Sequence, residues 1–97
     1  MTGKQRAYLR SLANPLETIL IVGKGGISDN VVKQTDEALR ARELVKGRVL
    51  EASLLSAREA CEALAAATGS EGVQVIGSRF VLYRQNPDAP KITLPKG

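Results

Sequence analysis

The distribution of apolar and polar residues along the chain predicts three helices and four strands. Apolar residues recur at helical spacing after Thr2, Ser28 and Ser56, and each of these three residues is of a type favoured at a helix N-cap. Asn14-Pro15 and Gly69 supply the end signals of the first and third helices. Strands are predicted at residues 17–22, 43–51, 73–76 and 79–84.

The order of these elements predicts an α/β (α+β) two-layer sandwich. The elements read α-β-α-β-α-β-β, so the first strands are connected through helices and the last two form a hairpin at Gly77-Ser78. This order gives a mixed four-stranded sheet with helices packed on it. The strand at 17–22 is apolar on both faces, which is typical of a central, covered strand. Gly47 inside the second strand indicates a β-bulge.

Alternation within the last two strands predicts which side chains enter the core. One face holds the expected core residues. The other face carries both polar and apolar residues, and we expect it to be either partly exposed or covered by a helix. The core face contains Val73, Val75, Phe80 and Leu82, and the mixed face contains Gln74, Ile76, Arg79, Val81 and Tyr83. We expect one domain over residues 1–97, in which the proline-rich segment 86–97 is a loosely ordered tail with a candidate edge strand at 91–94.

The segment Gly23-Lys24-Gly25-Gly26 lies between an apolar strand and the helix that begins at Ser28. Backbone N–H groups are unpaired at such a junction, and the helix dipole adds positive charge, so the site favours an anion such as phosphate. The spacing fits neither the nucleotide-hydrolase loop nor the dinucleotide fingerprint, whose third glycine would fall at Ser28. It fits the G-x-x-G loop that clamps a nucleic-acid backbone in KH-like modules. The alternative is a tight strand-to-helix turn without a ligand.

Composition argues against catalysis and metal binding. The 97 residues include one cysteine, Cys61, and no histidine, which removes an internal disulfide, the commonest general base and the commonest metal ligand. Cys61 lies in the apolar stripe of the third helix and is predicted to be buried. We therefore expect no enzyme, no metal, no cofactor and no small-molecule substrate. No apolar run is long enough for a membrane helix, and Met1–Arg10 lacks a signal-peptide core, so a cytoplasmic location is expected. We also expect a monomer.

Charge is distributed unevenly along the chain. The net charge of +4 lies entirely in the first half, up to Arg48, which contains nine of the 14 basic residues and five of the ten acids. The same half holds the glycine loop. Such an asymmetry indicates a polyanionic partner, although a solvated basic surface would look the same.

Several ordered motifs together resemble the CRM domain, and in particular the stand-alone bacterial YhbY-like proteins. They are Thr2–Arg6 followed by Leu9-Arg10, Ile21–Ser28, Ala38-Leu39 with Arg42–Lys46, Val73–Gly77 and Val81–Arg84. The resemblance implies a fold related to the KH-like C-terminal domain of translation initiation factor three. It also implies RNA binding at the glycine loop and association with precursors of the large ribosomal subunit, whose ribosomal RNA would be the partner.

The resemblance also implies which residues contact RNA. Phosphate contact is expected at the glycine loop, Gly23, Lys24, Gly25 and Gly26, and a basic surface is expected from Lys4, Arg6, Arg10, Lys33, Lys46 and Arg84. Two positions depart from the family pattern, which often has histidine at Arg42 and a β-branched residue at Gly47. We expect Gly47 to weaken its strand by roughly 0.5–1 kcal/mol relative to alanine.

Tyr8, Phe80 and Tyr83 are the aromatic residues of the chain, so base stacking on aromatic rings is scarce. Recognition through phosphates, sensitive to salt and tolerant of sequence, is therefore predicted. The competing hypothesis is a protein-binding adaptor that docks a ribosomal or assembly protein on the mixed hairpin face or on the tail. A small enzyme acting on phosphorylated substrates is a third reading, without an evident base or metal site.

Overall fold

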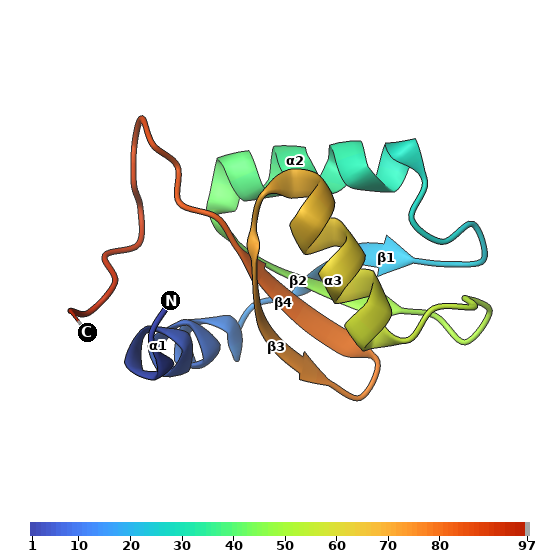
Figure 1. Cartoon of the computed structure of the whole chain (residues 1–97), viewed down its shortest axis with the longest axis horizontal. Coiled ribbons are helices and arrows are strands. Elements are labelled where there is room, and N and C mark those ends of the chain that lie inside the picture. The colour runs from blue at the N-terminus through green and yellow to red at the C-terminus, as the bar shows by residue number, and fades with distance from the viewer. Residues whose placement is uncertain (97) are drawn as a thin grey trace.

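The computed structural model describes residues 1–96, over which three helices and four strands follow in the predicted order. In Figure 1, α2 and α3 lie together over one face of the sheet, and α1 lies away from them against the other face. The elements are α1 Gly3–Ala13, β1 Thr18–Val22, α2 Asp29–Arg42, β2 Leu44–Val49, α3 Ala57–Thr68, β3 Glu71–Ile76 and β4 Arg79–Tyr83.

The four strands form one sheet in the order β1-β2-β4-β3. β1 and β2 are parallel and connected through α2, whereas β4 is antiparallel to both β2 and β3. The mixed four-stranded sheet and the α+β class predicted from the sequence are therefore confirmed. β3 and β4 form the expected hairpin, and Gly77 adopts the positive φ of 57° that its tight turn requires.

Local sequence signals set the helix boundaries. The Thr2 and Ser56 side chains accept hydrogen bonds from the amides of Gln5 and Glu59, and both glutamine and glutamate side chains bond back to the N-cap amide. These are complete capping boxes, and they confirm the N-caps predicted at Thr2 and Ser56. Ser28 caps α2 by accepting from the Val31 amide at 3.2 Å. Gly69 ends α3 in the left-handed conformation that glycine favours.

The prediction that β1 is a central, covered strand is wrong. β1 is an edge strand, and its burial alternates: Leu20 and Val22 are buried, whereas Ile19 and Ile21 are 38% and 43% exposed. α1 packs mainly on β2, β3 and β4, so it leaves this end of the second face uncovered. An apolar run therefore did not distinguish a covered strand from a strand with a half-open face.

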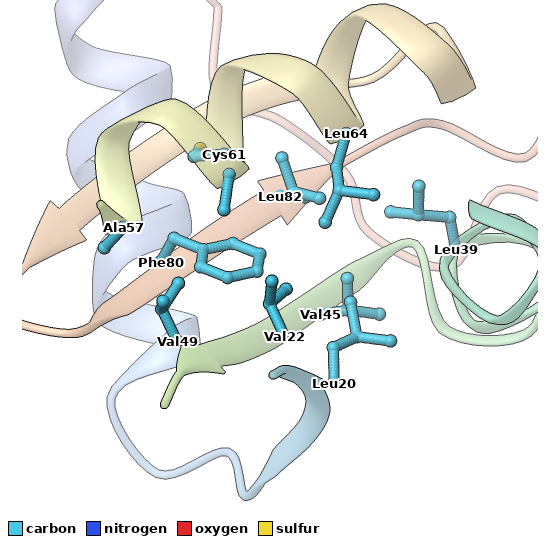
Figure 2. Close-up of a cluster of buried hydrophobic side chains, with 11 residues drawn as sticks. Leu20, Val22, Leu39, Val45, Val49, Ala57, Cys61, Leu64, Phe80 and Leu82 are labelled. Carbon is cyan, nitrogen blue, oxygen red and sulfur yellow. The ribbon is translucent and has the colours of Figure 1, made fainter. Parts of the chain in front are cut away.

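The larger core lies between the sheet and the α2–α3 layer. Figure 2 shows the Phe80 ring in its centre, below Cys61 of α3 and beside Val22 and Val49 of the sheet. Cys61 is buried, as predicted, and burial raises the pKa of its thiol. A smaller core lies under α1 and contains Leu9, Ala13, Leu44, Val73, Val81 and Tyr83.

Two details of strand register differ from the predictions. The β3–β4 register shifts between Gly72 and Gln74, so Val73 joins Val81 in the smaller core, while Val75 packs against the larger one. The prediction that Val73 and Val75 share a face is therefore wrong. Gly47, in contrast, is in regular register with Phe80, and the bulge expected there is absent from β2.

The segment after β4 runs back along the α1 side of the molecule without helix or strand over residues 86–96, so the candidate edge strand at 91–94 does not form. Ile92 and Leu94 pack against the smaller core. The Glu43 carboxylate accepts hydrogen bonds from the amides of Asn86, Lys91 and Ile92 at 2.7–2.8 Å. Burial alone would raise the pKa of Glu43, but these three donors lower it below its ordinary value.

Candidate functional site

The glycine loop forms a tight turn at the end of β1. The Gly26 amide donates to the Gly23 carbonyl oxygen at 3.0 Å, and Gly26 has a φ of 65°. Lys24 and Gly25 occupy the exposed tip of this turn. Among residues 1–96 the amides of Lys24 and Gly25 meet no hydrogen-bond acceptor. The turn therefore presents two free N–H donors beside an ammonium group, which is a set of groups that an anion can bind.

The first turn of α2 carries a negative charge of its own. Asp29 follows the Ser28 cap directly, and both side chains are exposed. A carboxylate in the first turn already interacts with the positive end of the helix dipole and repels a second anion there. The favoured anion position is therefore the turn of the glycine loop, where Lys24 supplies the charge, and not the axis of α2.

Gly25 is a glycine that the fold itself does not require. Its φ is not positive, and a Cβ added at this residue would meet no atom of the chain within 4 Å. Gly26 differs, because its positive φ disfavours any side chain. The isolated protein could therefore accommodate a side chain at residue 25. A glycine there leaves room for an external group to approach the backbone closely.

The loop between β2 and α3 lies against the glycine loop. Leu50 and Leu55 are the nearest neighbours of Cβ atoms built at Gly23 and Gly26, at 3.6 and 3.9 Å, and the Leu50 amide donates to the Val22 carbonyl oxygen. Figure 1 shows the two loops at the same end of the molecule. Leu54, at the tip of the second loop, is 97% exposed. The sequence analysis did not identify this loop as a neighbour of the glycine loop.

The basic residues of α1 lie at the opposite edge of the sheet from the glycine loop. The Arg6 guanidinium donates to the Gly72 carbonyl oxygen of β3, and Arg6 and Arg10 line a shallow depression with Arg58 of α3. β3 and β1 are the two edges of the sheet, so three strand spacings, roughly 14 Å, separate these strands sideways. The group is farther than this from the glycine loop, because Arg6 contacts the start of β3 whereas the loop follows the end of β1. Lys4 is exposed on α1.

Three further predicted residues have different surroundings. Lys33 is exposed on α2, one to two turns after the glycine loop. The Lys46 ammonium donates to the Asn14 carbonyl oxygen at 3.3 Å and is half-buried on the α1 side of the sheet. The Arg84 guanidinium bonds Asp36 at 2.7 Å and the Thr68 carbonyl oxygen at 2.8 Å. Arg84 thus joins α2 to α3 and lowers the pKa of Asp36, which is a structural role.

Two arginines that the sequence analysis did not select lie between the separated groups. Arg48 of β2 and Arg79 of β4 are directly paired across the sheet, and both are exposed. Alternation in β2 could have placed Arg48 on the face of Lys46. The pairing of β2 with β4, however, depends on tertiary structure, so no local pattern indicates that Arg48 and Arg79 are neighbours.

The surfaces that an adaptor would use are largely covered. Val81 and Tyr83 of the mixed hairpin face lie under α1 in the smaller core, and Ile92 and Leu94 of the tail pack against the same core. On the same mixed hairpin face Gln74 is half-buried, and the apolar residue that remains well exposed there is Ile76, at 64%.

Within residues 1–96, no helix combines the length and apolarity needed to cross a bilayer. The same residues contain no group of three or more side chains of the types His, Cys, Asp and Glu placed to hold a metal ion.

The fold and this surface define a small α+β domain with an exposed glycine loop, a candidate anion site, beside an open sheet face. The chain belongs to the CRS1/YhbY (CRM) domain family, whose model matches residues 1–84. It is 45% identical over 95 residues to the probable RNA-binding protein YqeI of Bacillus subtilis, covering 98% of this chain and 99% of that protein. It is 32% identical over 96 residues to a Haemophilus influenzae protein named RNA-binding protein, covering 99% and 96%.

A solved structure has the same fold. The solution structure of a Staphylococcus aureus protein described as a candidate RNA-binding protein superposes with a TM-score of 0.82 and 48% sequence identity. The match covers 98% of this chain and 99% of that protein. The resemblance to the CRM family inferred from the sequence motifs is therefore confirmed.

Proposed function

We propose that this protein binds RNA, and that the glycine loop holds the RNA phosphate backbone. The names of the relatives support the partner, because the Bacillus subtilis and Haemophilus influenzae proteins are both named as RNA-binding. The free amides of Lys24 and Gly25 and the Lys24 ammonium support the site. Binding through such groups recognises phosphates, so it is expected to tolerate changes of base sequence and to weaken with salt.

Gly25 is the observation that carries the proposal. Neither backbone conformation nor packing within residues 1–96 accounts for a glycine at this position. A phosphate oxygen that accepts from the Lys24 and Gly25 amides must approach the main chain closely, and a methyl group on Gly25 would stand in its way. The proposal therefore explains a residue that the fold alone leaves unexplained.

Gly25→Ala is expected to weaken RNA binding about tenfold while leaving stability unchanged. A tenfold loss is about 1.4 kcal/mol, close to the lower end of the roughly 1.5–3 kcal/mol that one hydrogen bond to a charged group is worth. Fluorescence anisotropy with a labelled single-stranded RNA at low salt measures the affinity, and thermal unfolding checks the fold. Gly3→Ala is the matched control, because Gly3 also has no positive φ and no atom within 4 Å of an added Cβ. Unchanged affinity in Gly25→Ala would argue against the loop.

We further propose that the RNA is ribosomal RNA in precursors of the large ribosomal subunit. The motifs shared with YhbY-like proteins support this assignment. In a sucrose-gradient fractionation, the wild-type protein is expected to sediment with large-subunit precursors, and Lys24→Glu is expected to shift it to the top of the gradient. Sedimentation of the wild type with messenger RNA or with no RNA would contradict the assignment.

A further inference from the structure

A row of four side chains crosses the open end of the sheet beside the glycine loop. Ile21 is paired with Arg48, Arg48 with Arg79, and Arg79 with Ile76, so β1, β2, β4 and β3 each contribute one residue. Residues in direct register project from the same face of a sheet. All four are exposed, and we call this set the arginine row.

The arginine row contains two like charges without compensation. Arg48 and Arg79 are direct cross-strand neighbours, an arrangement that is unfavourable in the free protein. Among residues 1–96, neither guanidinium has a carboxylate within 4 Å or a hydrogen-bond partner. All their donors are therefore available to a ligand, and a polyanion is the ligand that would relieve their repulsion.

The position of the row connects the two groups of basic residues that the fold separates. At one end, only Val22 separates Ile21 from the glycine loop. At the other end, Ile76 lines the depression that also contains Arg6, Arg10 and Arg58. The row therefore connects the β1 and β3 edges of the sheet, and Arg48 and Arg79 at its centre can contact phosphates.

We propose that the arginine row binds an unpaired RNA strand that crosses the open sheet face from the glycine loop to the arginines of α1. This inference rests on the proposed RNA-binding function and adds that the bound RNA is single-stranded. Guanidinium planes stack on unpaired bases, and Ile21 and Ile76 offer apolar contact at either side. A duplex keeps its bases stacked inside, so it gains only the phosphate contacts from such a face.

Removal of both guanidinium groups tests the inference. Arg48→Gln with Arg79→Gln is expected to weaken binding of a labelled ten-nucleotide oligouridine at least tenfold in 50 mM salt. The slope of log K against log salt is expected to become about 1.4 smaller in magnitude, since each phosphate contact to a single strand contributes about 0.7. The variant keeps its fold, because it removes a repulsive pair from exposed positions, and thermal unfolding verifies this.

The matched control removes two positive charges elsewhere. Arg40→Gln with Lys91→Gln changes two exposed residues: Arg40 is near the C-terminal end of α2, and Lys91, in the segment after β4, donates to the Ala41 carbonyl oxygen at that end. This end lies about 20 Å along α2 from the glycine loop. The control variant is expected to change oligouridine affinity less than twofold and to leave the slope of log K against log salt unchanged. An equal loss in this control would overturn the inference, because binding would then follow net charge alone.

The remaining outcomes separate the two proposals. If the arginine variant binds like the wild type while Gly25→Ala weakens binding, the row has no role and the glycine-loop proposal stands. If the wild type binds no RNA, both proposals fail. If the wild type bound a duplex of the same length with equal affinity, the proposal that the bound RNA is unpaired would be overturned. A complex with cellular protein that survives 0.5 M salt and nuclease, and depends on Arg48 and Arg79, would overturn RNA as the occupant.

Discussion

Gly47→Val is expected to destabilise the protein by about 3 kcal/mol, although valine is a better strand former than glycine. A Cβ at residue 47 would lie within 2.7 and 2.9 Å of Phe80 Cε2 and Cε1, and closer still to Cζ. Real Cβ atoms do not approach other carbons so closely, so the buried Phe80 ring would have to move. Overfilling a packed core typically costs about 1–3 kcal/mol. Urea unfolding followed by circular dichroism measures the change.

The pair Gly47–Phe80 explains a departure from the family pattern. The aromatic ring fills the space that a β-branched side chain would occupy, and it covers the glycine across the strand pair. Gly47 is therefore required for packing. Strand propensity predicts that Gly47→Ala stabilises the protein, but the contact with Phe80 makes the substitution destabilising. The control is Gly47→Val with Phe80→Leu, which should recover at least about 1 kcal/mol relative to Gly47→Val alone. Independent, additive effects of the two substitutions would contradict direct contact.

Glu43→Ala is expected to lower the free energy of unfolding by about 3 kcal/mol and to release the segment after β4. The substitution removes the acceptor of three part-buried backbone N–H donors, and water replaces it once the segment is released, so the net loss is about 1 kcal/mol for each hydrogen bond. Glu43 also has a φ of 64° and a ψ of −43°, a conformation that costs about 1–3 kcal/mol and that the carboxylate contacts maintain. Urea unfolding measures stability, and hydrogen exchange at the Lys91 and Ile92 amides reports the release.

The same carboxylate makes stability depend on pH. The pKa of Glu43 is lowered in the folded protein, so its contribution is fully present above the ordinary value of 4.5 and is lost as the pH falls through the folded pKa. Glu43→Gln, which keeps the shape without the charge, is expected to be less stable than the wild type at pH 7 and to approach it at pH 3. A constant difference between the two proteins over this range would contradict the assignment.

Local features of the fold were predictable because their causes lie within a few residues. Thr2, Ser56 and Gly69 fix helix ends through bonds to neighbouring backbone groups, and all three were predicted from the sequence. The glycine loop was also located between the correct strand and helix. The RNA contacts proposed for it remain predictions, since their cause is a ligand.

Features that depend on strand order and register could not be obtained in this way. The edge position of β1, the shift that moves Val73 to the smaller core, and the neighbours Arg48 and Arg79 all follow from tertiary pairing. Gly47 could be interpreted only after Phe80 was placed across from it. The separation of Arg6 and Arg10 from the glycine loop likewise follows from sheet order.

The edge position of β1 has a consequence for handling the protein at high concentration. Among residues 1–96 no strand pairs with the outer side of β1, and its sequence, Thr-Ile-Leu-Ile-Val, contains neither lysine nor proline. Such an edge can template intermolecular sheets, and only its five-residue length limits the hazard. A lysine introduced at Ile19 would guard the edge against fibril growth without touching the arginine row.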